Sequence, residues 1–492
     1  MMSQNRMYPA LKLRFSDIVF IAVLFVALIL GQQMLSLDSD LGRHLTLGNY
    51  ILDKRIIPTI DLLSHTRAGI SRPPYEWLSQ VIFALANRLL GLDGVVLLSS
   101  LVIALTFTLI YQFANRRSGS PIVTLLLVFL AAGASSIHWL PRPHIFTFLL
   151  LAIWVEQLDQ FVEGKLTNIY IFPIIMLFWA NMHGGFIFGI LVWIAYFAGW
   201  LWDVWRKKSD SQVGKKLLLI GVLSSIATII TPDLWHNWDA VINNRSAFIL
   251  NRTVETMRPN LLDTAILPYT VLLVLTVLLC VLNWKTIKAH HVFLLAGLGL
   301  MSLVMARNIP LFTIACTPLL AEMSTSLLSK SKVWSQIEHR FAGFNTEGRS
   351  IWPFIATLLA VTYFLYFNFR NDHSLYQFDS NIFPVGAVNF LEENPQSGNM
   401  FNEFNWGGYL EYRLWPHHKV LLDSQSDFYG ETLMREYDQL FAAKDDWETL
   451  LEKYQVDWAI GPSNAPLVSA LQNKQSWDVI YQDAVATVLR KP

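Results

Sequence analysis

Long apolar stretches separated by short polar loops fill the first three quarters of the chain. A helix needs roughly 20 apolar residues to cross the ~30 Å hydrocarbon core of a bilayer. Runs near that length lie at residues 17–36, 95–113, 121–140, 145–162, 168–181, 184–205, 217–231, 263–282, 291–306, 309–325 and 351–368. The pattern predicts a mainly α-helical polytopic membrane protein with about 11–13 transmembrane helices.

One segment fits two descriptions. Residues 75–92 read YEWLSQVIFALANRLLGL and could form a further span or a helix lying in the membrane interface. Glu76 and Arg88 favour the interface, because charged side chains are costly in hydrocarbon.

Basic residues predict the orientation, since cytoplasmic loops of membrane proteins are enriched in Lys and Arg. The N-terminus carries Arg6, Lys12 and Arg14, and alternate loops carry Arg116–Arg117, Lys165, Arg206–Lys208, Lys285 with Lys288, and Lys330–Arg349. Eleven spans place all of these clusters on the inside. The N-terminus is then cytoplasmic, and the chain beyond residue 370 lies outside the membrane.

The C-terminal part differs in pattern and in charge. Strand-like runs at 399–404, 419–424, 456–461 and 486–491 alternate with helix-like stretches at 385–394, 431–441, 445–454 and 465–473, which predicts a small α/β domain. Residues 371–492 hold 18 acidic and 8 basic residues, a net charge of −10, whereas residues 1–370 hold 19 and 29, a net charge of +10. We therefore predict a transmembrane domain over 1–370 and an extracytoplasmic α/β domain over 371–492.

Composition narrows the class of protein further. Only 15% of the residues are charged, against about 25% in soluble proteins, and the formal net charge is zero. These values exclude a disordered chain, a basic nucleic-acid binder and an ordinary soluble enzyme. Cys280 and Cys316 both lie in apolar runs, so no disulfide framework is indicated.

The first outer loop, residues 37–74, is unusually rich in charge for that side of the membrane. Its basic residues are Arg43, Lys54, Arg55, Arg67 and Arg72. Two explanations stay open: a phosphate-bearing ligand at the outer surface, or contact with anionic lipid.

Asp40 is the first candidate for chemistry in this loop. A carboxylate just outside a transmembrane helix can act as a general base or hold a divalent cation. His44 would share a helix face with Asp40 and is a candidate for substrate binding, as is Arg43. Asp38 is either a second catalytic acid or a cap at the start of this short helix.

Further candidates lie at other outer helix ends. Glu255 could activate an acceptor or share a cation with Asp40; Mg²⁺ and Mn²⁺ are the ions considered. Arg307 is a candidate partner for a carrier phosphate. Polar groups at membrane depth favour function, with hydrogen bonding between helices as the alternative. The remaining substrate-binding candidates are Arg142, His144, Asn181, His183 and Asn308.

Several motifs together resemble one superfamily. They are DLGRHLTLGNYI at 40–51, IPTIDLLSHT at 57–66, YEWLSQ at 75–80, RPH at 142–144, WANMHGG at 179–185, VETMRPN at 254–260, ARNIPLF at 306–312, FNEFNWGGYL at 401–410 and KVLLDSQ at 419–425. In this order they resemble the GT-C type of polytopic membrane glycosyltransferases, in an uncharacterised bacterial branch. Many relatives carry aromatic residues where this chain has Gly42 and Arg43.

The resemblance implies transfer of a sugar from a polyprenyl-phosphate carrier at the outer face of a bacterial inner membrane, with an acid in the first outer loop, matched by Asp40, at its centre. The acceptor would be a lipid, a cell-envelope glycan or a protein, and nucleic acid is not a partner. Two alternatives remain: a transporter or flippase of lipid-linked saccharides, and a non-catalytic assembly subunit without an open cavity beside Asp40.

Overall fold

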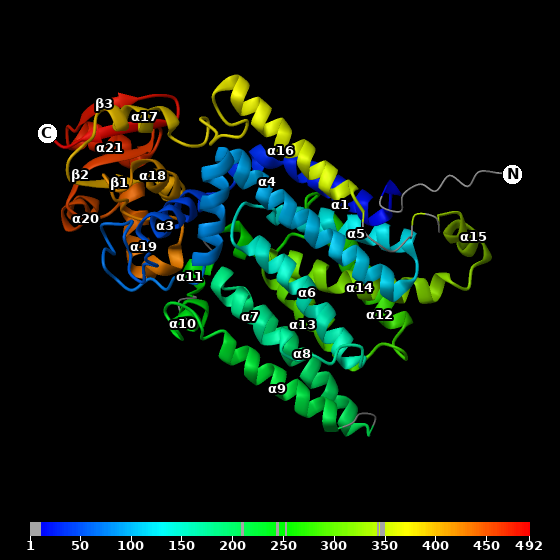
Figure 1. Cartoon of the computed structure of the whole chain (residues 1–492). Coiled ribbons are helices and arrows are strands. Elements are labelled where there is room, and N and C mark those ends of the chain that lie inside the picture. Colours follow the sequence, from blue (N-terminus) through cyan, green and yellow to red (C-terminus); the bar gives the residue numbers. More distant parts are fainter. Residues whose placement is uncertain (1–10, 208–210, 243–245, 251–252, 342–343, 345–349) are drawn as a thin grey trace.

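Helices dominate the computed structural model, which describes residues 11–207, 211–242, 246–250, 253–341, 344 and 350–492 (Figure 1). The predicted clusters extend beyond these residues at Arg6, Lys208 and Arg349. The helices of the first part are α1 (Phe15–Ile29), α2 (Gly31–Ser36), α3 (Leu41–Lys54), α4 (Trp77–Ser118), α5 (Pro121–Ser135), η2 (Ser136–His138), α6 (His144–Val162), α7 (Ile171–Met182), α8 (Phe186–Trp205), α9 (Ser211–Ala227), α10 (His236–Ile242), α11 (Ala247–Leu250), η3 (Val254–Thr256), α12 (Leu267–Leu282), α13 (Ala289–Val304), η4 (Ala306–Asn308), α14 (Ile309–Leu328), α15 (Lys332–Phe341) and α16 (Trp352–Asn371).

Each predicted apolar run overlaps a helix of this part, and the runs at 17–36 and 121–140 each extend over two helices. Among the described residues, six helices are long and apolar enough to cross a membrane: Trp77–Ser118, Pro121–His138, His144–Val162, Phe186–Trp205, Ala306–Leu328 and Trp352–Asn371. Shorter apolar helices are Phe15–Ile29, Ile171–Met182, Leu267–Leu282 and Ala289–Val304. The outward side chains of α16 are apolar, with Phe354 66% exposed, and such a surface needs lipid around it. The protein is therefore an integral membrane protein.

Residues 75–92 form the beginning of α4. The helix breaks at Leu90 and Gly91, where Gly91 has a φ of 62° that glycine adopts without strain. Before the break, Arg88 pairs with Asp53 of α3 at 2.6 Å. This part of α4 thus packs on α3, and its place in the membrane interface remains a prediction.

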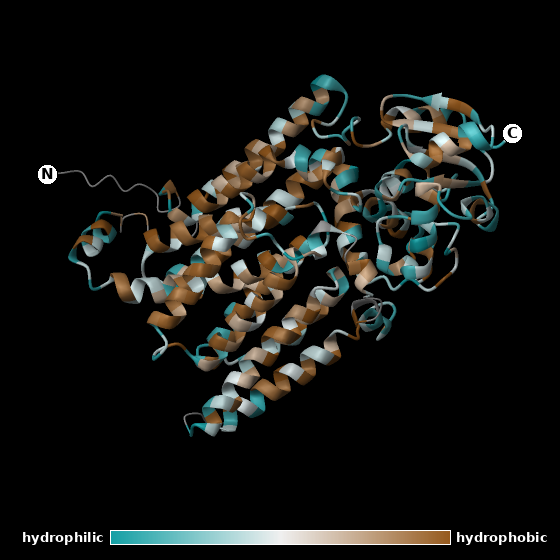
Figure 2. Cartoon of the chain, turned by 180° about the vertical axis from the view of Figure 1, so that it is seen from behind, coloured by the Kyte–Doolittle hydropathy of each residue, from teal (hydrophilic) through white to brown (hydrophobic). Residues whose placement is uncertain are grey.

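The helix bundle has two chemically distinct ends. Loops predicted to be cytoplasmic meet at one end, where Arg117 bonds Asp159 at 2.5 Å and Lys288 bonds Glu163 at 2.8 Å. Loops predicted to be outside meet at the other end, next to the C-terminal domain (Figure 1). Hydrophobic residues predominate along the helices between these ends (Figure 2). This arrangement agrees with the predicted alternation of the spans.

The C-terminal domain combines a four-stranded sheet with helices. Its elements are α17 (Val385–Glu393), β1 (Asn399–Asn402), η6 (Phe404–Trp406), α18 (Gly407–Leu414), α19 (Ser426–Ala442), α20 (Trp447–Lys453), β2 (Val456–Pro462), α21 (Pro466–Lys474), β3 (Asp478–Gln482) and β4 (Ala486–Arg490). The strand order is β1-β2-β4-β3, with β1 parallel to β2 and the other pairs antiparallel. Buried Trp458 and Ile460 of β2 join a core with Val388 and Leu410.

One predicted strand is wrong and one strand was missed. Residues 419–424 do not enter the sheet; Val420 instead bridges to Ser64 of the first loop. The run looks strand-like because Val420, Leu421 and Leu422 are all buried between that loop and the domain. The sheet's fourth strand is β3, whose residues are largely exposed and carry a weak apolar pattern.

The first loop and the C-terminal domain are joined through two glycines. A Cβ atom on Gly42 of α3 would lie 2.0 Å from the carbonyl oxygen of Gly408, and a Cβ on Gly408 of α18 would lie 2.4 Å from the carbonyl oxygen of Ser39. The backbones of α3 and α18 are therefore in direct contact, which leaves no room for a larger residue at position 42.

Candidate functional site

A cavity of about 780 Å³ lies at the outer end of the bundle, beside the C-terminal domain. One part of its wall is polar and contains Asp40, Arg43, His44, Glu76, His138, Arg142, His144, His183, Glu255, Arg307, Asn308 and Asp427. Another part is apolar and contains Ile187, Phe188, Leu191, Leu300, Met301, Val304 and Leu311. Such a cavity can take a molecule with both a charged and a hydrocarbon portion.

Asp40 lies in the polar wall directly before α3. Its Oδ1 is 3.2 Å from Arg43 Nη2 and accepts a short hydrogen bond from the Ser424 hydroxyl, while its Oδ2 is 2.9 Å from Arg142 Nη1. Burial alone would raise the pKa of Asp40, but Arg142 and Arg43 outweigh it and hold the pKa well below its usual range. Asp40 therefore carries a fixed negative charge at neutral pH.

Asp38 has a different position from Asp40. It is 1% exposed and does not line the cavity. Its Oδ1 accepts the backbone N–H groups of Asp40 at 2.8 Å and Leu41 at 3.1 Å, together with Nε of Arg142 at 2.8 Å. Burial raises the pKa of Asp38 to about 6. Asp38 thus fixes the start of α3 and orients Arg142, as a helix-capping acid does.

Glu255, in η3, reaches the same arginine. Its Oε2 is 3.7 Å from Arg142 Nη1 and 3.9 Å from His138 Nδ1. The guanidinium of Arg142 thus lies between the carboxylates of Asp40 and Glu255, where a shared cation would have to bind. A cation there would need to displace Arg142, so these two acids in this arrangement do not fit a metal.

Glu76 is an acid that the sequence analysis did not select. It is the residue before α4, with a side chain 14% exposed, and its oxygens lie 3.9 Å from His44 Nδ1 and 3.9 Å from His183 Nε2. Burial raises the pKa of Glu76 to about 7. The YEWLSQ motif and the charge at the head of an apolar segment were the available signals. They entered the family resemblance and the placing of residues 75–92, and neither was used to choose Glu76.

Two histidines of the cavity, His44 and His183, lie on either side of Glu76. His44 also lies 3.4 Å from the side-chain amide of Gln80, and His183 Nδ1 lies 2.8 Å from the Thr147 hydroxyl. Burial lowers the pKa of His44, and burial together with the neighbouring charges lowers the pKa of His183 to about 3. Both rings are therefore neutral at pH 7 and can bind sugar hydroxyl groups by hydrogen bonds.

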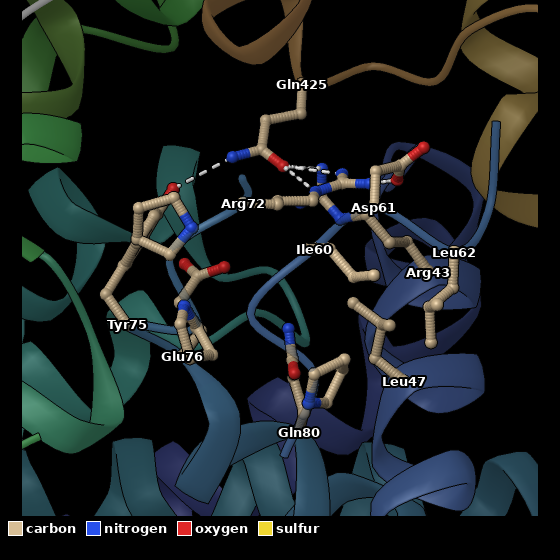
Figure 3. A pocket seen from close by; sticks show the side chains of 13 residues that line it. Arg43, Leu47, Ile60, Asp61, Leu62, Arg72, Tyr75, Glu76, Gln80 and Gln425 are labelled. Carbon is tan, nitrogen blue, oxygen red and sulfur yellow. Dashed lines mark hydrogen bonds and ion pairs between the residues drawn. The ribbon is translucent and has the colours of Figure 1, made fainter. Parts of the chain in front are cut away.

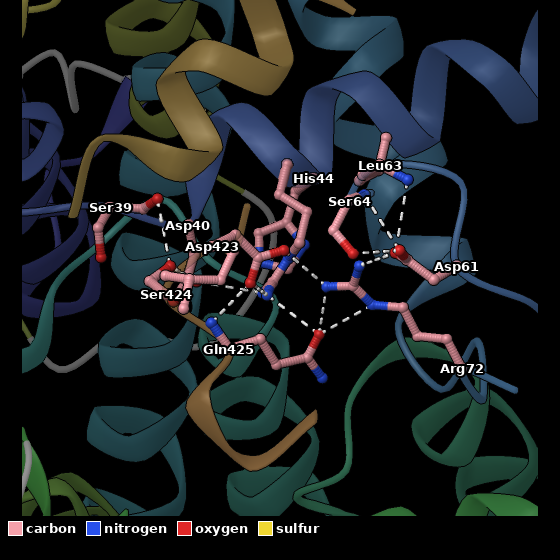
Figure 4. Close-up of polar contacts among 12 residues, drawn as sticks. Ser39, Asp40, His44, Asp61, Leu63, Ser64, Arg72, Asp423, Ser424 and Gln425 are labelled. Atoms are coloured by element: carbon pink, nitrogen blue, oxygen red, sulfur yellow. Dashed lines mark hydrogen bonds and ion pairs between the residues drawn. The ribbon is translucent and has the colours of Figure 1, made fainter. Parts of the chain in front are cut away.

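Arg43 and Arg72 lie at the contact between the first loop and the C-terminal domain. Arg72 bonds Asp61 at 2.6 Å and Asp423 at 2.9 Å, and Arg43 lies 3.4 Å from Asp423 (Figure 4). Gln425 accepts from both arginines and donates to Tyr75 (Figure 3). In this structure the buried first-loop arginines pair with protein carboxylates.

The other predicted residues divide between two places. Arg307 and Asn308 of η4 line the cavity, and within the described part of the chain Arg307 has no ion pair with a carboxylate. His144 lines the cavity at the start of α6. Asn181 does not: it accepts from Trp77 at 2.7 Å and donates to the carbonyl oxygens of Leu177 and Ile230. Asn181 therefore makes the hydrogen bonds between helices that the sequence allowed as the alternative.

Comparison with known proteins gives the fold a precedent. No family model and no curated protein matches the sequence. The crystal structure of an Archaeoglobus fulgidus oligosaccharyltransferase in the apo form matches with a TM-score of 0.58 at 11% identity, over 93% of this chain and 70% of that one. The same organism's AglB with an inhibitory peptide and dolichol-phosphate matches with a TM-score of 0.55, also at 11% identity over 93% and 70% of the two chains. ArnT from Cupriavidus metallidurans bound to undecaprenyl phosphate has a TM-score of 0.47 at 12% identity, over 96% and 97%.

The chain thus shares the fold of these oligosaccharyltransferase structures, which confirms the predicted GT-C-like fold class. At 11% identity, this likeness is one of fold.

Proposed function

We propose that this protein is an integral membrane glycosyltransferase that takes a sugar from a polyprenyl-phosphate carrier and transfers it to a lipid, glycan or protein acceptor. The single observation that carries the proposal is the cavity, in which a wall of charged and hydrogen-bonding groups adjoins an apolar wall. A sugar phosphate on a hydrocarbon chain has the same two portions. The solved relative in fold with bound dolichol-phosphate supports a lipid-linked donor.

The donor would bind across the two walls. The polyprenyl chain would lie against Phe188, Leu191 and Leu300, and its phosphate against Arg307, the cavity arginine without a carboxylate partner among the described residues. Of the phosphate partners that the sequence predicted, this assignment keeps Arg307 of η4 and leaves out the first-loop arginines.

Glu76 and Asp40 have separate roles in the proposed reaction. In the reaction, the acceptor oxygen bonds to the anomeric carbon, the bond from that carbon to the phosphate oxygen breaks, and the acceptor hydroxyl loses a proton. Glu76, whose pKa of about 7 suits a proton acceptor near neutral pH, takes that proton. Asp40 stays ionised and stabilises positive charge that develops on the sugar. Glu255 and Arg142 position Asp40.

A divalent cation stays a separate prediction. Magnesium or manganese at Asp40 would require Arg142 to move away, and stimulation of the chelated enzyme by either ion would reveal it.

The proposal includes the membrane and the orientation of the chain in it. The site would face the outside of a bacterial inner membrane, with the N-terminus in the cytoplasm and residues 371–492 outside. An open cavity beside Asp40 weighs against the non-catalytic subunit that the sequence left open.

The test is genetic and chemical. A strain that lacks the protein should lose one glycosylated lipid, glycan or protein in a mass-spectrometric profile, and the wild-type gene should restore it. Asp40→Asn should not restore it, although the variant protein accumulates in the membrane.

Asp53→Asn is the matched control, because Asp53 lies in the same loop but is 60% exposed in its side chain and pairs with Arg88 outside the cavity. This control should restore the product. Full restoration by Asp40→Asn would refute the role of Asp40, and an unchanged profile in the deletion strain would refute the proposed transfer.

A further inference from the structure

A second cluster of polar side chains lies in the bundle, at the end opposite the cavity. Asp159 is near the end of α6, and His290 and His291 are in the first turn of α13. All three are buried, with exposed fractions of 3%, 4% and 4%. Among the described residues, this is the one group of three or more potential metal ligands whose ligand atoms lie close together.

The spacing of the ligand atoms suits a metal ion. Asp159 Oδ1 is 2.8 Å from Nε2 of His291 and 3.8 Å from Nε2 of His290, and all three atoms lie within 4.8 Å of one another. A tetrahedral ion with bonds of about 2.1 Å holds its ligand atoms roughly 3.4 Å apart. The two measured distances lie on either side of that value, so small side-chain shifts suffice.

His290 provides an independent observation. Its Nε2 atom is buried and has no hydrogen-bond partner, although it is directed at Asp159. A buried nitrogen without a partner is unfavourable, and such atoms in native proteins are usually satisfied by something. His291 alone would satisfy Oδ1 of Asp159, so hydrogen bonding within the cluster leaves His290 unexplained.

The surroundings hold the three side chains in place. Arg117 bonds the other oxygen of Asp159 at 2.5 Å and also binds Glu322 at 2.8 Å. The ring of His290 stacks on Tyr196 with centroids 4.9 Å apart. A Cβ on Gly199 would lie 2.4 Å from the backbone of His290, so α8 and α13 touch at this point. Outer contacts of this kind orient metal ligands and fix their geometry.

We propose that Asp159, His290 and His291 bind a divalent transition-metal ion, of which zinc suits two imidazoles and a carboxylate best. The ion would connect α6 to α13 at the predicted cytoplasmic end of the bundle. With the ion bound, its two positive charges and that of Arg117 would face the two negative charges of Asp159 and Glu322, which gives a net charge of +1. The site is structural, and it does not depend on the proposed glycosyl transfer.

The test uses the full chain, purified in detergent without a polyhistidine tag, stripped with a chelator and given zinc alone. The wild-type protein should bind one zinc per chain by mass spectrometry of the metal and should gain thermal stability on addition of zinc. His290→Phe should weaken binding at least about tenfold and abolish the gain in stability. The phenyl ring keeps the stacking on Tyr196, so this variant should still fold.

Two further variants complete the design. Asp159→Asn should also lose the zinc, whereas His339→Ala, at an exposed histidine of α15, should bind as the wild type does. The opposite result is clear as well. If the wild type binds no zinc, or if His290→Phe keeps the same affinity and stabilisation, the cluster is a hydrogen-bonded group and the proposal is wrong.

Discussion

At the scale of single residues, the site is defined by two carboxyls in opposite environments. Asp40 lies between two guanidinium groups, whereas Glu76 is buried among neutral imidazoles. The first environment keeps a carboxylate charged and the second favours the neutral acid. This difference is the reason why we propose Asp40 as the fixed charge and Glu76 as the proton acceptor.

A pH profile tests that division. Because burial raises the pKa of Glu76 to about 7, Glu76 is protonated below that pH and becomes a competent base above it. We expect kcat/KM of the wild type to rise through about pH 7. Glu76→Gln should lose roughly 10²–10⁴-fold in rate and lack this rising limb.

The matched comparison is Glu255→Gln, which removes a different cavity acid and should keep the limb whatever its rate. An identical rise in Glu76→Gln would show that another group titrates.

The stability of the contact between the first loop and the C-terminal domain depends on Asp423. Asp423→Asn would remove the buried carboxylate that Arg43 and Arg72 share and leave them paired only with Asp40 and Asp61. Removing one partner from a buried ion pair costs up to about 3–5 kcal/mol. We expect a clear fall in the unfolding temperature in detergent. Glu392→Gln, which breaks the exposed pair with Arg413, should cost about 1 kcal/mol or less. Equal effects would contradict the structural role of Asp423.

The sequence predicted individual residues unevenly. Asp40, Arg142, His183 and Arg307 were chosen because charged or polar groups at outer helix ends are rare, and the structure places all four in the lining of one cavity. Glu76 was not selected, because its segment looks amphipathic. The pairing of Arg72 with Asp423 could not be predicted from the sequence, since the two residues lie 351 positions apart along the chain.

At the scale of elements, the contact between α3 and α18 holds the site together. Gly42→Ala would place a methyl group against the Gly408 carbonyl, so the two helices must separate. We expect this variant to lose several degrees of unfolding temperature and most of its transfer activity. Gly297→Ala in α13 is the control, because a Cβ there meets nothing within 4 Å. A fully stable Gly42→Ala protein would show that the contact tolerates movement.

Elements that are long and strongly apolar were predictable, and those defined by tertiary pairing were not. Hydrophobic length alone located the helices of the bundle. Residues 419–424 have the composition of a strand, but their partner is the first loop, and composition does not indicate which partner a buried segment takes. The same limit applies to β3, whose pairing with β4 decides its conformation.

At the scale of the whole molecule, the basic loops of residues 1–370 and the net negative charge of residues 371–492 predict the orientation of the chain in the membrane. The predicted orientation can be tested with single cysteines in a chain without Cys280 and Cys316. Ser71→Cys and Gln475→Cys should react with a membrane-impermeant maleimide in cells with a permeable outer barrier, and Lys165→Cys should react only after lysis. All three positions are exposed, so accessibility to the reagent depends on the side of the membrane. Labelling of Lys165→Cys in intact cells would reverse the orientation.

The pairing of Arg43 with Asp423 also sets the order of events during synthesis. The two residues are 380 positions apart, and at about 5–20 residues per second the ribosome needs roughly 20–80 s to make the chain between them. Throughout that interval Arg43 and Arg72 have no carboxylate from the C-terminal domain, and the contact between that domain and the first loop cannot form. In a chain that stops before Asp423, Arg43 and Arg72 can pair only with Asp40 and Asp61 of the first loop. The contact between the two ends of the chain therefore forms only after the last quarter of the protein has been made.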